Sequence, residues 1–228
     1  MPLPVLLFDV NETLLDTSAL DPPFARAFGA ASARRHWFLV LEELWMTAAI
    51  TGAYQPFDKL ARAALEMTAA RESRHLDAAA RGAILDGLQA LPPHAEAPAA
   101  LDELGAAGIR LAALTNSTLR SATNQLRHAD LAQFLETIFS AEQVKRYKPA
   151  PEPYLHAARK LGVQPAMLYL VSAHAWDISG ADAAGLHTVF VRRPGAAASP
   201  VGPKPDIEVA DLAQLARNIV DRRARRKR

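Results

Sequence analysis

The chain contains short, continuous runs of apolar residues, and polar clusters follow most of them. Residues 5–8, 109–114 and 168–171 are such runs, and residues 188–191 form a fourth. Apolar runs of this length are typical of strands that are buried on both faces of a parallel sheet. We therefore predict that these four segments are strands of the protein core.

Segments with helical spacing of apolar residues separate the later runs. Helices are predicted over residues 119–129 and 152–161, and a third is predicted to follow Asp177 and to end before Gly185. Strands that alternate with helices favour a parallel sheet with helices on both faces. The predicted fold class is therefore α/β, with a doubly wound, Rossmann-like parallel-sheet core.

The alternation of strands and helices stops over residues 20–91. This segment is rich in Ala, Leu, Glu and Arg and contains no strand-like run, so we interpret it as an inserted helical cap domain. A turn between cap helices is predicted at residues 52–56, and prolines at 92, 93 and 98 mark the return to the core. The predicted organisation is a hydrolase core (1–19 and 92–216), a helical cap (20–91) and a basic C-terminal tail (217–228).

The composition of 228 residues, 50% of them hydrophobic and 22% charged, is that of a folded globular protein. Cysteine is absent, which excludes disulfides, thiolate metal sites and cysteine nucleophiles. No apolar run is long enough to span a bilayer. The short apolar stretch near the N-terminus ends in an acid, which favours a strand over a signal peptide. We therefore expect a cytoplasmic protein without a membrane partner.

Positive charge is concentrated in residues 217–228. Seven basic residues stand there against Asp221 alone, about +6, whereas the formal net charge of the whole chain is +2. A basic run of this kind can bind nucleic acid, but a solvated, frayed chain end explains it more simply. We predict no nucleic-acid partner.

Polar residues that follow the predicted strands are candidates for a functional site, because ligands of open α/β sheets bind beyond the carboxyl ends of the strands. Each residue alone has an ordinary structural explanation, since an aspartate after a strand usually caps a turn or a helix. Clusters after several strands are a stronger signal than any single residue. The candidates are Asp9, Asn11 and Thr13, then Thr115, Asn116 and Ser117, and finally Ser172, His174 and Asp177.

These clusters resemble the four motifs of the haloacid dehalogenase superfamily. The segment FDVNETLLD at 8–16 resembles the first motif, LTNS at 114–117 the second, the Lys-Pro pair at 148–149 with Tyr154 the third, and VSAHAWD at 171–177 the fourth. One such match would be weak evidence, but four in order cover nearly the whole chain. The residues of these motifs are most similar to those of the L-2-haloacid dehalogenase (type II) branch.

The resemblance implies that Asp9 is a nucleophile, which forms a covalent ester that water then hydrolyses. Lys148 would pair with Asp9 and stabilise its ionised form. The alternative interpretation of Lys148 is an ordinary surface lysine. Asp177 would position or activate the water as a general base, with Ser172 beside it.

Other residues would orient the nucleophile or contact the substrate. Thr13 would hydrogen bond to Asp9, or would cap a turn instead. Thr115 and Asn116 would donate to the substrate carboxylate or to Asp9. For His174, catalysis and support of a neighbouring group are both open, because the dehalogenase branch usually has Asn at this position. The substrate-binding residues that we predict are Asn11, Phe38, Thr115, Asn116, Tyr154 and His174.

Two departures from the motifs bear on the choice between branches. Phosphatases of the superfamily have an aspartate two residues after the nucleophile and another in the fourth motif, where this chain has Asn11 and Ala173. Neither residue transfers a proton or binds a hard cation as a carboxylate does. We therefore predict a metal-independent reaction without a cofactor.

The cap departs from the dehalogenase pattern as well. Members of that branch have an Arg directly after a Trp, and this Arg binds the substrate carboxylate and the departing halide. Here Phe38 follows Trp37. Arg34, Arg35 or His36 are alternatives for the missing cation, while Phe38 would suit a less polar substrate end or a different leaving group.

Three functions stay open at this point. The preferred one is a hydrolase of carbon–halide bonds that resembles (S)-2-haloacid dehalogenases and acts on a small 2-haloacid. The alternatives are a related hydrolase with another substrate, such as a small phosphate ester, and a catalytically silent binding module, because one fold hosts many chemistries. The predicted partner is a small molecule, a short carboxylate. Association of the chain into a homodimer stays an open alternative.

Overall fold

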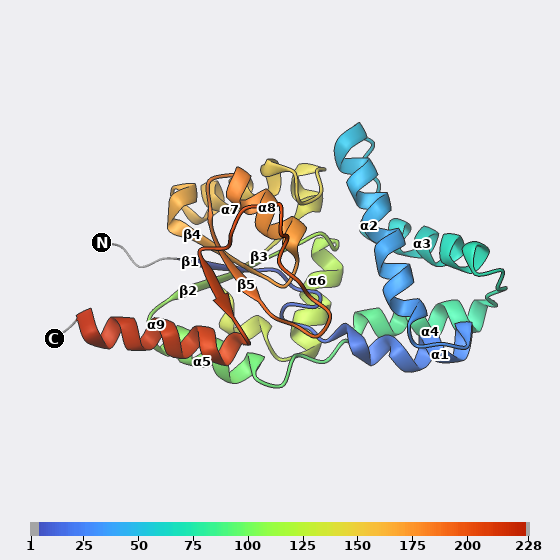
Figure 1. Cartoon of the computed structure of the whole chain (residues 1–228), viewed down its shortest axis with the longest axis horizontal. Coiled ribbons are helices and arrows are strands. Elements are labelled where there is room, and N and C mark those ends of the chain that lie inside the picture. The colour runs from blue at the N-terminus through green and yellow to red at the C-terminus, as the bar shows by residue number, and fades with distance from the viewer. Residues whose placement is uncertain (1–4, 227–228) are drawn as a thin grey trace.

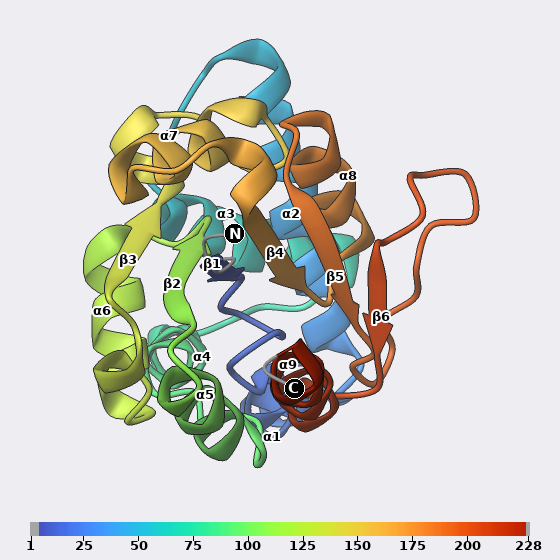
Figure 2. The same cartoon turned by 90° about the vertical axis from the view of Figure 1, so that its left-hand side faces the viewer.

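Six parallel strands form one sheet in the order β3-β2-β1-β4-β5-β6 (Figures 1 and 2). The computed structural model describes the backbone of residues 5–226 and the side chains as far as residue 221. The chain winds outward from β1 first to one side and then to the other, which is the doubly wound arrangement that the sequence predicts. The strands are β1 (Val5–Phe8), β2 (Arg110–Thr115), β3 (Thr137–Ser140), β4 (Leu168–Ser172), β5 (His187–Val191) and β6 (Ile207–Val209).

The four predicted strands coincide with β1, β2, β4 and β5 to within one residue at each end. Strands β3 and β6 were not predicted, and both lie at the edges of the sheet. Thr137 in β3 and Glu208 in β6 are exposed, which interrupts the apolar pattern of two very short segments. Edge strands are buried less completely than central ones, so they do not read as continuous apolar runs.

Helices cover both faces of the sheet because successive residues of each strand point to opposite sides. In β1, Val5 and Leu7 pack with residues of α7 and α8, whereas Leu6 and Phe8 pack on the side of α5, α6 and α9. The helices are α1 (Asp21–Phe28), α2 (Ala33–Thr51), α3 (Phe57–Arg71), α4 (Ala78–Gln89), α5 (Ala97–Ala106), α6 (Leu119–His128), α7 (Pro151–Leu161), α8 (Ala175–Ala183) and α9 (Leu212–Arg226), with short 3₁₀ helices η1 (Thr17–Leu20), η2 (Ala132–Phe134), η3 (Ala141–Val144) and η4 (Pro165–Met167).

Helices α1 to α4 form a separate helical unit between β1 and α5 (Figure 1). The predicted turn lies between α2 and α3, where Gly52 takes a left-handed conformation (φ 72°) that ends α2. Trp37 of α2 is buried, and its Nε1 donates to Ala61 O of α3 at 3.1 Å. We call this unit, residues 21–89, the cap.

Helix α9 runs across position 217, so the basic segment begins within a helix. Leu212, Leu215 and Ala216 are buried at the start of this helix, which packs beside α5. Residues 227 and 228 of the predicted basic tail lie outside the described residues. None of the described helices combines the length and the apolar character that a membrane crossing requires.

Candidate active site

The polar clusters that follow β1, β2 and β4 meet at the carboxyl edge of the sheet, where the strand order reverses. Asp9 follows β1 directly, and its backbone N–H donates to Val171 O of β4 at 2.9 Å. The fourth predicted motif leads from β4 into α8. This helix begins at Ala175, before Asp177 and not after it as the sequence indicates, and therefore places Asp177 in its first turn.

Lys148 lies between two carboxylates. Its Nζ is 2.8 Å from Asp9 Oδ1, 2.8 Å from Asp177 Oδ2 and 3.0 Å from Leu114 O, so all three of its hydrogens have an acceptor. The side chain is completely buried. Burial disfavours the charged form of Lys148, but Asp177 and Asp9 outweigh this effect and raise its pKa above the ordinary value. Lys148 is thus a buried cation and not a surface lysine.

Both oxygens of Asp177 are occupied inside the core. Oδ2 accepts from Lys148, and Oδ1 accepts from the hydroxyl of Tyr154 at 2.5 Å. Burial raises the pKa of Asp177, and Lys148 offsets this only in part. Burial and the Asp177 charge likewise raise the pKa of Tyr154. Gly180 permits this packing, because a Cβ there would lie 2.7 Å from the Tyr154 hydroxyl.

Thr13 orients the second oxygen of the candidate nucleophile. Its hydroxyl donates to Asp9 Oδ2 at 2.8 Å and accepts from the backbone N–H of Ala173 at 3.0 Å. Ser172 is also buried, but its Oγ accepts from the backbone N–H of His174 at 3.1 Å. Asp9 is therefore held from one side by Thr13 and from the other by Lys148.

Residues of the second motif, at the end of β2, hydrogen bond to the third motif. Asn116 donates to Lys148 O and accepts from Lys148 N, and Thr115 Oγ1 accepts from Ser117 N at 3.1 Å. Asn11 donates to Ser117 Oγ at 3.2 Å. The side-chain amide of Asn116 thus hydrogen bonds to the Lys148 backbone. Asn116 also lines the cavity at Asp9.

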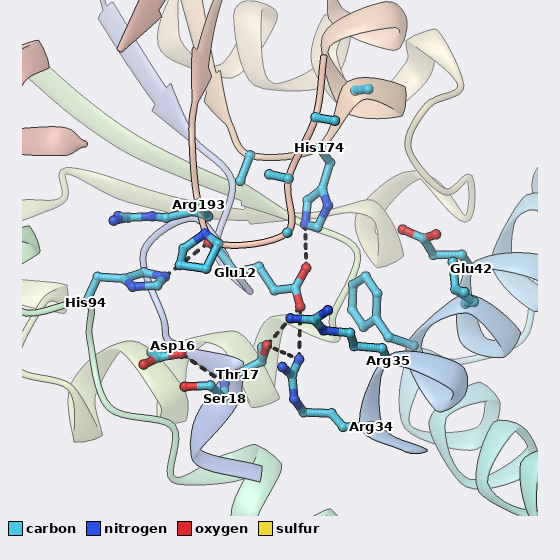
Figure 3. Close-up of a pocket in the computed structure, with 18 of the residues that line it drawn as sticks. Glu12, Asp16, Thr17, Ser18, Arg34, Arg35, Glu42, His94, His174 and Arg193 are labelled. Carbon is cyan, nitrogen blue, oxygen red and sulfur yellow. Dashed lines mark hydrogen bonds and ion pairs between the residues drawn. The ribbon is translucent and has the colours of Figure 1, made fainter. Parts of the chain in front are cut away.

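Two cavities adjoin this cluster. The smaller one has a volume of about 20 Å³, enough for about one water molecule, and lies at Asp9. The larger one, of about 520 Å³, lies between the loop after β1, the start of α2 and the loop after β5 (Figure 3). The smaller cavity is lined by Asp9, Asn11, Phe38, Trp45, Phe57, Thr115, Asn116, His174 and Trp176.

Three stacked rings line both cavities and so form the wall that the cavities share. The His174 ring lies between Phe38 (centroids 5.7 Å apart, planes at 19°) and Trp176 (5.0 Å, 18°). Phe38 belongs to the cap and the other two to the core, so the cap contributes to the wall beside Asp9. Trp176 is fixed in turn, because its Nε1 donates to Glu42 of the cap at 2.7 Å.

The family model of haloacid dehalogenase-like hydrolases matches residues 3–185. The chain belongs to this family.

Relatives named (S)-2-haloacid dehalogenase match almost the full chain. The one from Pseudomonas sp. (strain YL) is 30% identical over 90% of this chain and 87% of its own length. Another, from Pseudomonas putida, is 30% identical over 96% of this chain and 99% of its own length. An L-2-haloacid dehalogenase structure from Xanthobacter autotrophicus, with chloropropionic acid covalently bound, shares the fold at a TM-score of 0.88 and 22% identity, covering 96% of this chain and 98% of that one.

The alternatives for the missing cap arginine do not line the smaller cavity of this haloacid dehalogenase-like hydrolase. Arg34 is buried and bonds to Asp21 (Nε to Oδ1, 2.5 Å) and to Thr17 (2.9 Å). Arg35 lines the larger cavity, and His36 forms an exposed pair with Glu72. Phe38 does line the smaller cavity, and its contact with the substrate stays a prediction.

Several site residues were not predicted from the sequence. Trp45, Phe57 and Trp176 line the smaller cavity, and Glu12 lines the larger one. Trp45 follows Phe38 by seven residues, and this spacing places both on one face of α2. That periodicity is a signal by which Trp45 could have been found.

The donor set at Asp9 does not suit a hard divalent cation. The ammonium group of Lys148 lies between the carboxylates of Asp9 and Asp177, and the neighbouring Asn11 and Ala173 carry no carboxylate. Across the described residues, no group of three or more His, Asp or Glu side chains is arranged to hold a metal ion.

Proposed function

We propose that this protein is a hydrolytic dehalogenase of small 2-haloacids and that Asp9 is its nucleophile. The observation that carries the proposal is the position of the Asp9 carboxylate, which is fixed by Thr13 and Lys148 at the edge of a small cavity that cap residues help to line. Relatives named (S)-2-haloacid dehalogenase support it, because they match this chain over nearly their full length.

The first step is a displacement at carbon. One oxygen of Asp9 attacks the carbon that bears the halogen, the bond between this carbon and the halogen breaks, and the halide leaves with the electron pair. Lys148 and Thr13 hold the carboxylate in one orientation, so little reorganisation is needed before attack. Lys148 divides its charge between Asp9 and Asp177, so it does not fully neutralise the nucleophile.

The halide leaves into surroundings that are mostly aromatic. Phe38, Trp45, Phe57 and Trp176 line the cavity, and Trp45 Nε1 is buried without a hydrogen-bond partner among the described residues. A buried donor without a partner is costly and calls for an explanation. In this proposal the Trp45 N–H donates to the departing halide, a contact that the cap arginine makes in the dehalogenase branch.

The second step is hydrolysis of the ester between Asp9 and the substrate carbon. Water attacks Asp9 Cγ, the bond between Cγ and the substrate oxygen breaks, and a 2-hydroxy acid is released. Since the smaller cavity holds about one water molecule, the cap must open to admit substrate. Asp9 regains its carboxylate with one oxygen that comes from water.

Metal independence and a cytoplasmic location are part of the proposal. The Lys148 ammonium supplies the positive charge beside Asp9. In metal-dependent relatives, a magnesium ion would supply this charge. The absence of cysteine means that the fold does not require an oxidising compartment.

The test is halide release from short 2-chloro and 2-bromo carboxylates of both configurations, with phosphate esters assayed in parallel. Asp9→Asn should abolish halide release, whereas Asp102→Asn, at an exposed position of α5, should not change it. In a single turnover in heavy-oxygen water, the product should carry ordinary oxygen, because that oxygen comes from Asp9. Solvent oxygen in the first product, or release of phosphate instead of halide, would overturn the proposal.

A further inference from the structure

The smaller cavity offers few hydrogen-bond donors to the carboxylate of a 2-haloacid. Phe38 has no polar side-chain atom, and the N–H of Trp176 donates to Glu42. The amide of Asn116 bonds to both polar groups of the Lys148 backbone. A buried carboxylate without donors is costly. The donors that remain in the lining therefore determine how the substrate is held.

The remaining donors of the lining belong to Asn11, Thr115 and Trp45. The proposed function assigns the Trp45 N–H to the halide. The Thr115 hydroxyl accepts from Ser117 N and still has its own hydrogen to donate. Asn11 Nδ2 donates one hydrogen to Ser117 Oγ at 3.2 Å, and no acceptor for its second hydrogen lies within hydrogen-bond distance among the described residues. Asn11 and Thr115 are thus the donors left for a carboxylate.

The orientation of the Asn11 amide decides whether this residue attracts a carboxylate. The amide nitrogen donates and the amide oxygen accepts, so a reversed amide would present an acceptor to an anion. Ser117 does not select the orientation by itself, because a hydroxyl group both donates and accepts. A further contact must therefore fix which end of the Asn11 amide is the donor.

Gln125 provides that contact. It lies on the buried face of α6, and its Nε2 donates to Leu88 O at 2.6 Å and to Asn11 Oδ1 at 3.4 Å. A backbone carbonyl only accepts, so Leu88 O selects the nitrogen end of the Gln125 amide. That nitrogen in turn holds Asn11 Oδ1 and leaves Asn11 Nδ2 to donate. Because Leu88 belongs to the cap and α6 to the core, the contact forms where the end of α4 meets the core.

Packing alone does not explain a glutamine at position 125. The residue is 1% exposed, and its Oε1 is buried without a hydrogen-bond partner among the described residues. An unsatisfied buried oxygen destabilises a fold, whereas an apolar residue of similar shape, such as methionine, would avoid this effect. The donor end of Gln125 is therefore the part that has a function.

We propose that Gln125 is a positioning residue that fixes the Asn11 amide as a donor to the substrate carboxylate. This inference rests on the proposed function. The carboxylate binds to Asn11 Nδ2 and to the Thr115 hydroxyl, and both residues line the smaller cavity with Asp9. Gln125 lines neither cavity and acts only through Asn11. This subsite recognises an anion by oriented neutral donors, without a guanidinium at the position of Phe38.

The test compares an anionic ligand with a neutral one. Lactate is the 2-hydroxy acid that 2-chloropropionate would yield, and lactamide differs from it only in the carboxamide. Binding of each is followed through the fluorescence of Trp45 and Trp176, which line the cavity. In Gln125→Met, the dissociation constant of lactate should rise about tenfold or more. That of lactamide should change by less than about twofold, because a carboxamide can bond to either orientation of Asn11.

Kinetics of the same variant should separate binding from chemistry. The KM for 2-chloropropionate should rise as the dissociation constant of lactate does. Halide release at saturating substrate should fall by less than about threefold, because Thr13 and Lys148 still hold Asp9. In an Asn11→Ala background, Gln125→Met should weaken lactate binding no further, since the two residues act as one unit.

A second variant, Gln125→Glu, keeps the shape of the side chain. A neutral acid has a single hydrogen, which Leu88 O takes, and an ionised acid has none, so Asn11 Oδ1 loses its donor in either form. Lactate binding should therefore weaken as in Gln125→Met. The matched control is Gln133→Met, which removes an Nε2 that donates to Asp130 O at 3.0 Å away from both cavities. It should bind lactate as the wild type does, and melting temperatures will show whether each variant is folded.

Three results would overturn the inference. Unchanged lactate binding in both Gln125 variants would show that the glutamine is dispensable. Equal weakening of lactate and lactamide would show that it only supports the fold. Additive effects of Gln125→Met and Asn11→Ala would show that it does not act through Asn11. If the wild type releases no halide from any 2-haloacid, the proposed function fails, while the two ligands still decide the role of Gln125.

Discussion

The side chain of Asn116 hydrogen bonds to both polar groups of the Lys148 peptide backbone. Its Oδ1 accepts from Lys148 N at 2.8 Å, and its Nδ2 donates to Lys148 O at 3.2 Å. Both residues are buried, and they join the end of β2 to the loop before α7. Asn116 therefore determines where the Lys148 ammonium lies relative to Asp9.

Replacement of Asn116 by aspartate should weaken this attachment. Asn116→Asp substitutes an acceptor for the Nδ2 donor, so Lys148 O loses its partner inside the core. We expect a loss of about 1–3 kcal/mol in the free energy of unfolding, together with slower ester formation. Urea denaturation and rapid-quench halide measurements check this. Asn124→Asp, on the exposed face of α6, is the control, and equal effects in both variants would contradict the prediction.

The assignment of Trp45 to the halide makes a separate prediction. Trp45→Phe keeps an aromatic wall but removes the buried N–H, so formation of the ester should slow by about tenfold to a hundredfold. The comparison is Trp37→Phe, which removes an N–H bonded to Ala61 O away from both cavities. This second variant should be less stable yet form the ester normally. A normal first step in Trp45→Phe would refute the assignment.

Glu42 should make the stability of the protein depend on pH. Burial raises the pKa of Glu42 above its ordinary value of 4.5, so the folded state holds this proton more tightly than the unfolded chain. The stabilisation by the proton is complete below pH 4.5 and is lost as pH rises through the folded-state pKa. Glu42→Gln keeps an acceptor for Trp176 Nε1 without a buried charge.

We therefore expect Glu42→Gln to be more stable than the wild type at neutral pH. The difference between their melting temperatures should shrink as pH falls through the folded-state pKa and should be smallest below pH 4.5, where Glu42 is protonated in both states. Glu43→Gln, which alters an exposed ion pair with Arg71, serves as the control. A difference that grows on acidification would show that the sign is wrong.

Activity should survive exhaustive chelation, and added magnesium should change it little. Magnesium needs near-octahedral oxygen coordination, whereas Lys148 lies between the two carboxylates that such an ion would use. The double variant Asn11→Asp with Ala173→Asp should begin to show dependence on magnesium. Loss of wild-type activity on chelation, with recovery on addition of magnesium, would place the protein in the metal-dependent branch of the family.

The central part of the fold was predictable because its strands are buried on both faces. Leu6, Leu7 and Phe8 are almost completely buried, and such residues form continuous apolar runs in the sequence. The edge strands β3 and β6 give no such run. Asp9 and Lys148 were also predictable, because each lies in a recognisable motif at the end of a strand or loop.

The wall beside Asp9 was not predictable in this way. Its rings come from the cap and from the fourth motif, and only the docking of the cap brings Phe38 against His174 and Trp176. Likewise, Glu12 lies in the first motif, but its contact with His174 depends on the positive φ of its backbone and on Arg34 from the cap. These relationships arise from long-range packing and not from local sequence pattern.

The stacking of Phe38 on His174 also constrains how this chain can diverge from its relatives. The dehalogenase branch has Arg and Asn at these two positions, and a guanidinium placed against an imidazole, or a phenyl ring against a short amide, would lose the ring-on-ring contact at 5.7 Å. A substitution at either position alone therefore opens the wall between the cavities. The two positions are expected to change together during evolution, as one inherited unit that spans the cap and the core.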